Sequence, residues 1–331
     1  MERIAASTEQ ERNDLFRETG ARRNMSPAVV EKDFWVCWTL GRLFASEELA
    51  SKIMFKGGTS LSKVFGLIER FSEDIDLILN WAELPSKDPY AERSKSKQDA
   101  FNKRIVEESR EYIAQHLLPE VRSLLGDLCE VSGVDDEPDV IHVRYPVGFS
   151  IEYLLPEILL EIGPLAQWTP NDSYAIQPYA AEAFPELFEH PRCRVQAVCA
   201  ERTFWEKATI LHHQAHRPED KPVPLRCSRH YYDLARMAER DIRGASLGDL
   251  DLLRSVVEFK TRFYPQKWAR YELAKPGTLQ LIPPEHVLTE IRRDYEAMQI
   301  MIYGEAPPLD EILGVLGDLE DEINALGEQG A

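Results

Sequence analysis

The sequence predicts an α+β protein, and two observations carry that prediction. Segments with a β pattern occur between helical ones in the first part of the chain, without the regular βαβ alternation of a doubly wound sheet, and helical patterns alone follow after about Phe188. At ~150 residues per domain, the 331 residues correspond to about two domains. We therefore expect N-terminal helices and an α/β domain with a mixed sheet over residues 1–188, and a mostly helical domain over 189–331.

The first helices are expected between residues 8 and 48, where apolar residues recur at helical spacing after Ser26 and Pro27. Trp35 and Trp38 in this segment, and Trp205 later, are expected in the core rather than as platforms for bases. Further strands are expected at 52–55, 74–79, 141–145, 157–162 and 174–176. Further helices are expected at 59–67, 94–125 (one long helix or two), 195–216, 228–240, 249–261, 284–303 and 309–326.

Composition excludes two classes of protein. No segment approaches the ~18–20 uninterrupted apolar residues of a membrane helix, and the first residues contain no apolar region typical of a secretory signal. The five cysteines are odd in number and form no C-x-x-C pair. We therefore expect reduced thiols in a cytoplasmic protein that has no membrane partner.

The net charge of −18 argues against a protein whose whole surface binds nucleic acid. The charge is uneven, because residues 304–331 contain eight acids and no Lys or Arg, whereas residues 93–104 and 217–229 are rich in Lys and Arg. Two interpretations of the basic stretches stay open, a solvated face or a basic rim around a cleft. The acidic end either covers that cleft or keeps the protein in solution.

Asp74 and Asp76 form the strongest chemical signal in the sequence. They are two residues apart on an expected strand, so both carboxylates project from one face, while Ile75, Leu77 and Leu79 project from the other and should be buried. Two like charges at this spacing repel unless a cation lies between them. Oxygen ligands without His or Cys favour Mg²⁺ or Mn²⁺.

A glycine turn precedes this strand. Gly57 and Gly58 permit a close backbone approach, and Thr59 and Ser60 supply hydroxyls at the start of the next helix, which suits a phosphate. The segment does not match the Walker pattern. A plain turn from strand to helix, capped by a hydroxyl, is the alternative.

Glu161 is the expected third carboxylate. Apolar residues flank it on what we expect to be both faces of a buried strand, where an ionised carboxylate is costly unless it is paired or bound to metal. A salt bridge to a buried Arg is the alternative. Three carboxylates around a metal, beside a phosphate-binding turn, indicate phosphoryl or nucleotidyl transfer.

Two later helices add charged residues. Lys207 lies on an otherwise apolar helical stripe, so it either extends outward to solvent or binds a ligand such as a triphosphate. Asp233 lies one turn after Arg229, and a surface ion pair between them is the simplest interpretation. His212 and His216 have metal-ligand spacing but no evident third ligand, so we do not expect a metal there.

Together these motifs resemble the AbiEii/AbiGii toxin family, nucleotidyltransferase-like proteins of bacterial toxin–antitoxin and phage-defence systems within the polymerase-β-like superfamily. The matched motifs lie, in the family's order, at 56–61, at the Arg70-x-Ser72-x-Asp74-x-Asp76 run, at Glu161, at 201–207 and at 229–233.

The resemblance implies a nucleotidyltransferase fold, with a helical C-terminal domain that completes the active site, and transfer of NMP from NTP to an RNA acceptor, the tRNA 3′ end above all. It also implies Mg²⁺ (or Mn²⁺) and a cognate antitoxin encoded nearby. The implied roles are metal binding by Asp74, Asp76 and Glu161, catalysis by these three with Lys207 and Asp233, and nucleotide binding by Lys56, Gly57, Gly58, Thr59, Ser60, Ser72 and Lys207.

Two other functions stay open. An enzyme of the same fold could modify a protein hydroxyl or a small molecule, which the net charge of −18 favours, whereas the basic stretches favour RNA. A non-catalytic binding module is the third possibility. Asp74 and Asp76 argue against it, because such a module has no need of metal-ligand acids.

Overall fold

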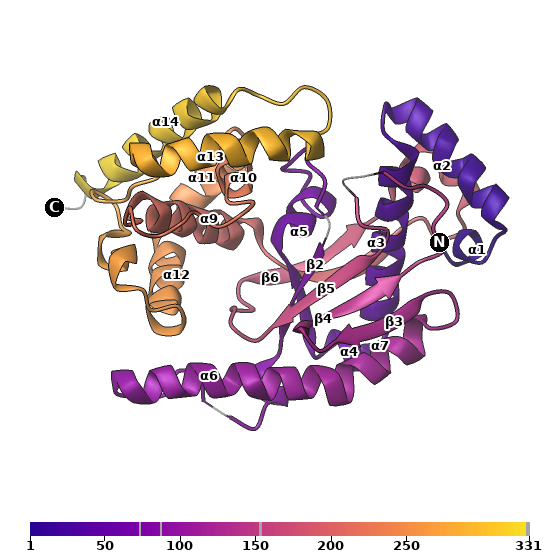
Figure 1. Cartoon of the computed structure of the whole chain (residues 1–331), viewed down its shortest axis with the longest axis horizontal. Helices are drawn as coiled ribbons and strands as arrows, with labels where there is room; N and C mark the ends of the chain where they lie inside the picture. Colours follow the sequence, from indigo (N-terminus) through magenta and orange to yellow (C-terminus); the bar gives the residue numbers. More distant parts are fainter. Residues whose placement is uncertain (73, 87, 152–153, 329–331) are drawn as a thin grey trace. The chain divides into compact units, whose positions relative to one another are not determined.

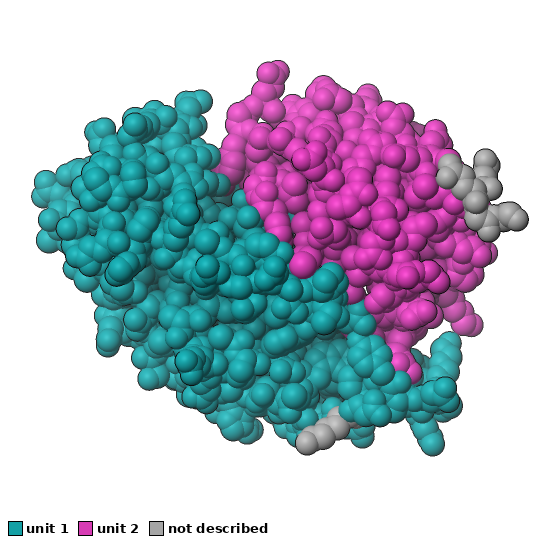
Figure 2. All heavy atoms as spheres, turned by 180° about the vertical axis from the view of Figure 1, so that it is seen from behind, with its two compact units in different colours: residues 1–64, 71–198 teal, residues 65–70, 199–331 magenta. Residues whose placement is uncertain are grey.

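The structure, a computed structural model, describes residues 1–72, 74–86, 88–151 and 154–328. The chain divides into two compact units (Figure 2). Unit 1 comprises Met1–Val64 and Phe71–Val198, and unit 2 comprises Phe65–Arg70 and Cys199–Ala331. The α+β class is confirmed, because unit 1 contains a mixed sheet and helices dominate the chain after it. The predicted boundary at residue 188, as a limit between independently folding domains, stays a prediction.

Unit 1 is built on a seven-stranded sheet in the described residues, in the order β3-β4-β5-β2-β1-β7-β6 (Figure 1). The pairs β1/β7 and β2/β5 are parallel and the other neighbours are antiparallel. The strands β1 and β2, on either side of the glycine turn, therefore lie in the middle of the sheet. The strands are β1 (Ile53–Lys56), β2 (Asp74–Leu79), β3 (Glu130–Val134), β4 (Glu137–Arg144), β5 (Ile158–Gly163), β6 (Asn171–Ile176) and β7 (Cys193–Val198).

Strand β7 was not expected from the sequence. The predicted helix from Val195 is wrong in its first turn, because Cys193–Val198 pairs with β6 and β1 instead, and the helix begins at Ala200. The β character of the chain therefore continues past Phe188. Val195 and Ala197 alternate with polar residues and are 1% and 0% exposed, which is the pattern of a strand. Only Cys199 separates this strand from an amphipathic helix, so the two periodicities merge in the sequence.

Helix α3 (Pro27–Ala45) is the central helix of unit 1. Trp35 and Trp38 are 0% and 3% exposed, and the Trp35 ring stacks on Tyr145, the residue after β4, with 5.8 Å between ring centroids. Both tryptophans belong to the core as predicted, and so does Trp205 of unit 2. The other helices of unit 1 are α1 (Glu2–Ala5), α2 (Glu9–Arg23), α4 (Glu47–Ala50), α5 (Gly57–Lys63), α6 (Lys95–Tyr112), α7 (Leu118–Leu125) and α8 (Tyr179–Ala183).

The helical stretch expected over 94–125 is present without a break. A π-helical turn at Ile113–Leu117 joins α6 to α7, and α6 is the long helix at the foot of Figure 1. Only one face of α6 is apolar, with Phe101 and Ile105 at 2% and 0% exposed. The opposite face is left to its charged side chains.

Unit 2 is helical in its described residues. Its last helix buries Leu316, Leu319 and Ile323, each at 0% exposed. Some acids of this end contact backbone and side chains of the same unit: Glu320 accepts from the Ile282 N–H at 3.1 Å, and Asp310 pairs with Arg292 at 2.6 Å. No helix in the described part of the chain is long and apolar enough to cross a membrane. The helices are α9 (Ala200–Ala215), α10 (Ser228–Ala238), α11 (Ile242–Leu247), α12 (Leu250–Phe263), α13 (Glu285–Met298) and α14 (Leu309–Glu328).

Candidate active site

Strand β2 has two chemically different faces. Asp74 and Asp76 are half-buried on one face, whereas Ile75, Leu77 and Leu79 on the other are 0%, 2% and 0% exposed. The alternation predicted from the sequence is confirmed. The apolar face anchors the strand in the core, and the position of both carboxylates is fixed by the pleat of the strand.

The register of the sheet places charged residues of three strands side by side. Asp76 is paired with Lys56 on antiparallel β1 and with Glu161 on parallel β5. Paired residues of neighbouring strands project from the same face, so the three side chains form a row across the sheet, with Asp74 one pleat further along. This row brings together, on one face of unit 1, four of the residues predicted for the site.

The predicted burial of Glu161 is wrong, because the side chain is exposed. Ile158, Leu160 and Ile162 are buried on one face of β5, but Leu159 on the other face is only half-buried. A run of apolar letters therefore does not make both faces of this strand internal. The place of Glu161 beside Asp76 depends on the register and not on a buried environment.

Gly57 lies directly against the Asp76 carboxylate. Its φ is +83°, a conformation that L side chains rarely adopt, and a Cβ at this position would lie 1.8 Å from Asp76 Oδ2. The glycine of this turn is thus required twice, by the backbone and by the carboxylate. The turn and the acid pair are parts of one arrangement.

Thr59 and Ser60 stabilise this arrangement through hydrogen bonds to the backbone. The Thr59 hydroxyl donates to the Asp74 carbonyl and the Ser60 hydroxyl donates to the Gly57 carbonyl at 2.8 Å, and both residues are buried. Their hydroxyl protons are therefore engaged by the backbone. Lys56, the residue before α5, does not cap this helix with its side chain.

A second group of predicted residues lies in unit 2. Asp233 of α10 is fully buried, and its two carboxylate oxygens accept from Arg70 Nε and a second guanidinium nitrogen at 2.7 and 2.8 Å. Lys207 Nζ of α9 lies 2.7 Å from Asp233 Oδ2. The surface ion pair with Arg229 that the sequence suggested is therefore wrong as a description of Asp233. Arg70 is the residue that sequence reasoning missed, and its only signal was its place in the run that ends at Asp76.

The charged groups of this triad are all buried. Two cations face one carboxylate, with Arg70 and Lys207 only 3% and 6% exposed. Burial alone would raise the pKa of Asp233, but Arg70 and Lys207 outweigh it and hold that pKa well below the usual range. Burial lowers the pKa of Lys207, which Asp233 only partly opposes.

The two groups of residues belong to different units, so their joint participation in one reaction stays a prediction. Ser72 is half-buried in unit 1 and carries no further sign of a role. Within the described ranges, no three His, Cys, Asp or Glu side chains are grouped so as to hold a metal ion. His212 is a structural residue, because its ring accepts from the Gln280 N–H at 3.0 Å and contacts the Arg270 carbonyl at 3.1 Å.

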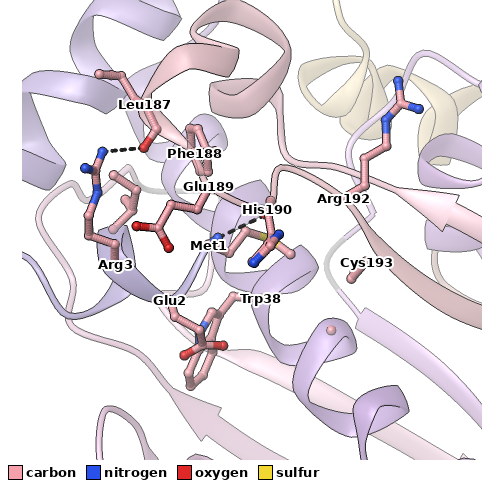
Figure 3. Close-up of a pocket in the computed structure, with 12 residues that line it drawn as sticks. Met1, Glu2, Arg3, Trp38, Leu187, Phe188, Glu189, His190, Arg192 and Cys193 are labelled. Carbon is pink, nitrogen blue, oxygen red and sulfur yellow. Dashed lines mark hydrogen bonds between the residues drawn. The ribbon is translucent and has the colours of Figure 1, made fainter.

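Unit 1 also has a pocket of about 180 Å³ that contains none of the predicted site residues (Figure 3). The chain terminus forms one wall, where the Met1 amino group donates to the His190 carbonyl at 3.2 Å. Trp38, Phe188 and Cys193 line other parts of it. None of the residues of the row across β1, β2 and β5 (Lys56, Asp74, Asp76 and Glu161), called the acid row below, lines this pocket.

Comparison with known proteins identifies the family to which the sequence is similar. The family model described as "Nucleotidyl transferase AbiEii toxin, Type IV TA system" matches residues 38–315. Among solved structures, the nucleotidyltransferase toxin MenT4 from Mycobacterium tuberculosis H37Rv aligns over 93% of this chain and 98% of its own, at 17% identity and a TM-score of 0.45. No curated protein matches the sequence.

Proposed function

Because the chain belongs to the AbiEii family of nucleotidyltransferase toxins from type IV toxin–antitoxin systems, its activity is nucleotidyl transfer, and we propose that the acceptor is RNA, the tRNA 3′ end above all, and that the reaction depends on Mg²⁺ or Mn²⁺. The family implies an NTP as substrate and an antitoxin as partner. The single observation that supports the proposed site is the row of Lys56, Asp76 and Glu161 across β1, β2 and β5, with Asp74 on the same face.

The donor set of this row fits a hard divalent cation. Asp74 and Asp76 offer carboxylate oxygens from one strand face, and Mg²⁺ is typically held by one or two carboxylates together with water and substrate phosphates. When bound, such an ion would neutralise the phosphate charge and lower the pKa of the attacking hydroxyl. Glu161 as a further ligand stays a proposal.

The protein's own residues would position the substrates. We propose that the backbone N–H groups of Gly57 and Gly58 bind the NTP phosphates, since the Thr59 and Ser60 hydroxyl protons are already donated to carbonyls. Lys56 adds a positive charge on the same face as Asp76. We propose that Lys207 supports the pyrophosphate leaving group and that Asp233, paired with Arg70, orients it.

In the proposed reaction, an oxygen of the acceptor hydroxyl forms a bond to the α-phosphorus of the NTP. The bond from that phosphorus to the oxygen that bridges the α- and β-phosphates breaks, and pyrophosphate leaves. The hydroxyl proton passes to Asp76 or Glu161. Little covalent chemistry is required of the side chains, so positioning and charge stabilisation dominate.

The first turns of α6 favour RNA as the acceptor. Lys95, Lys97, Lys103 and Arg104 are exposed, and only Asp99 among them is acidic. The first turn of the helix contains no acid, although acids are usually favoured there, so this positive charge is not explained by helix stability. A phosphate backbone is the complementary partner. In the other basic stretch, Arg217 instead turns inward, with its guanidinium 4.8 Å from the Trp268 ring centroid.

The proposal is tested by incubating the protein with Mg²⁺, each labelled NTP in turn and total bacterial RNA, followed by a denaturing gel. We expect label in a band of tRNA size, lost on chelation and regained with Mg²⁺ or Mn²⁺. Label on protein or on a small molecule would replace RNA with that acceptor. If the protein binds NTP but transfers label to none of these acceptors, the proposed acceptor class is contradicted.

The role of α6 has its own measurement. Replacing Lys95, Lys97 and Lys103 with Gln should weaken tRNA binding and reduce the slope of log affinity against log salt by about 2–3. The matched control replaces three exposed basic residues of unit 2, Arg240, Arg254 and Lys275. An equal change of slope in both variants would remove α6 from the RNA surface.

A further inference from the structure

Three consecutive charged residues are buried at the start of α3. Glu31, Lys32 and Asp33 are 1%, 0% and 5% exposed. Successive residues of an α-helix point about 100° apart, so these side chains leave the helix in three directions. A buried charge is costly unless it is paired and hydrogen-bonded, so each must find a partner within unit 1.

Glu31 and Lys32 bind the loop that leads into β5. The Gly148 and Phe149 N–H groups donate to the two oxygens of Glu31 at 2.8 and 3.1 Å. Lys32 Nζ donates to the Leu155 carbonyl at 3.0 Å. A Cβ on Gly148 would lie 1.9 Å from Asn13 Oδ1, so α2 closes on this loop from another side. The strand that follows carries Glu161.

Asp33 binds the end of α5. Its Oδ1 lies 2.6 Å from Lys63 Nζ, and its Oδ2 accepts from the Tyr179 N–H at 2.6 Å. The Lys63 ammonium also lies 3.9 Å from the centroid of the Tyr179 ring. Lys63 is the last residue of the helix that begins at Gly57, so Asp33 holds the C-terminal end of α5.

Lys32 also reaches the segment that precedes β2. Its ammonium lies 5.4 Å from the centroid of the Phe71 ring, and Phe71 is three residues before Asp74. The three charged residues therefore contact the end of α5, the segment before β2 and the loop before β5. The backbone of these three residues is held in place by the buried apolar residues of α3 on either side of them.

We propose that Glu31, Lys32 and Asp33 are positioning residues, which hold the Gly57 turn, the start of β2 and the loop before β5 in the arrangement that nucleotidyl transfer requires. Replacing a buried ion pair by apolar residues is often neutral for stability or increases it, so stability alone does not account for three such charges in one turn. A catalytic arrangement does, because a displacement of about 1 Å costs about 10²-fold in rate. The activity part of this inference rests on the proposed site.

The test removes both charges of one contact together, so that no buried charge is left unpaired. The variant is Asp33→Asn with Lys63→Met, in which the amide oxygen of the new side chain can still accept from the Tyr179 N–H. The matched control is Lys52→Met with Glu120→Gln, an ion pair of 3.0 Å in unit 1 that lies at the other end of β1 from the Gly57 turn. Glu48, the second partner of Lys52, is exposed and stays solvated in this variant. Three quantities are compared in the full chain: the thermal midpoint, hydrogen exchange of the 57–63 amides, and kcat for nucleotidyl transfer.

We expect the Asp33/Lys63 variant to unfold within about 3 °C of the wild type, its 57–63 amides to exchange at least about 10-fold faster, and kcat to fall about 10²-fold. The control should change neither exchange nor kcat. Unchanged exchange at 57–63, or an equal effect in the control, overturns the positioning role. A wild type without transfer activity overturns the proposed function instead, and the exchange measurement still decides whether Asp33 and Lys63 hold α5.

Discussion

The acid row of unit 1 and the buried triad of unit 2 place carboxylates in opposite environments. Asp74 and Asp76 lie half-buried on a strand face beside a third acid, whereas Asp233 is fully buried between Arg70 and Lys207. The first group gathers like charges on one strand face. The second surrounds its carboxylate with two cations. The two groups therefore differ in burial and in the charges that lie next to their carboxylates.

The largest effect is expected from removing a charge of the acid row. Asp76→Asn keeps the shape of the side chain but loses its charge, so transfer activity should fall by about 10³-fold or more while the thermal midpoint stays within about 3 °C. Steady-state transfer rates and thermal unfolding measure both. Asp172→Asn, an exposed acid on β6 of the same sheet, should leave both unchanged. Activity that survives in Asp76→Asn removes the acid row from the mechanism.

The triad should respond in the opposite way, through stability first. Asp233→Ala leaves Arg70 and Lys207 buried without their shared carboxylate and should lower the free energy of unfolding by about 3–5 kcal/mol. Chemical denaturation measures this. Removing the exposed partner Glu322 of Arg243 by Glu322→Ala should cost less than about 1 kcal/mol. Equal costs at the two sites would contradict the distinction drawn between a buried triad and a surface pair.

The fit of the glycine turn against Asp76 gives a third test of the acid row. Gly57→Ala introduces a Cβ where the distance to Asp76 Oδ2 is 1.8 Å and where φ is +83°, so the turn and the carboxylate must move apart. We expect about 10²-fold lower activity with a modest loss of stability. Gly66→Ala is the control, because its φ of +60° imposes similar strain but no atom lies within 4 Å of the added Cβ. The two variants should lose similar stability and differ in activity.

The smallest effect is a dependence of stability on acid pH. The pKa of Asp233 is lower in the folded protein than the ordinary value of 3.8, so the unfolded chain binds protons more readily as the pH falls. The stability that the ionised group contributes is therefore complete above that value and is lost below it. The difference in unfolding free energy between the wild type and Asp233→Asn should be constant above about pH 5 and shrink below about pH 4. A difference that stays constant through this range would show that Asp233 is not held ionised by its partners.

Sequence patterns predicted most of the secondary structure and most of the buried side chains. The alternation around Asp74 and Asp76 predicted the bounds of β2, and periodicity predicted the buried tryptophans and the helices of unit 2 other than α11. The predictions failed where neighbours in space decide. Glu161 is exposed because only one face of β5 is covered, and the first turn of the expected helix at Val195 is a strand because β1 and β6 flank it.

The sequence by itself determined which residue types carry the chemistry: an acid pair on one strand face, a glycine turn before it, and a lysine and an aspartate on later helices. Only the tertiary structure decided their partners. Arg70 and Asp233 are 163 residues apart in the chain, and the row of Lys56, Asp76 and Glu161 exists only through the register of three strands. Alternation and helical spacing are properties of neighbouring residues, whereas a salt bridge or a register depends on distant segments that meet only in the folded protein.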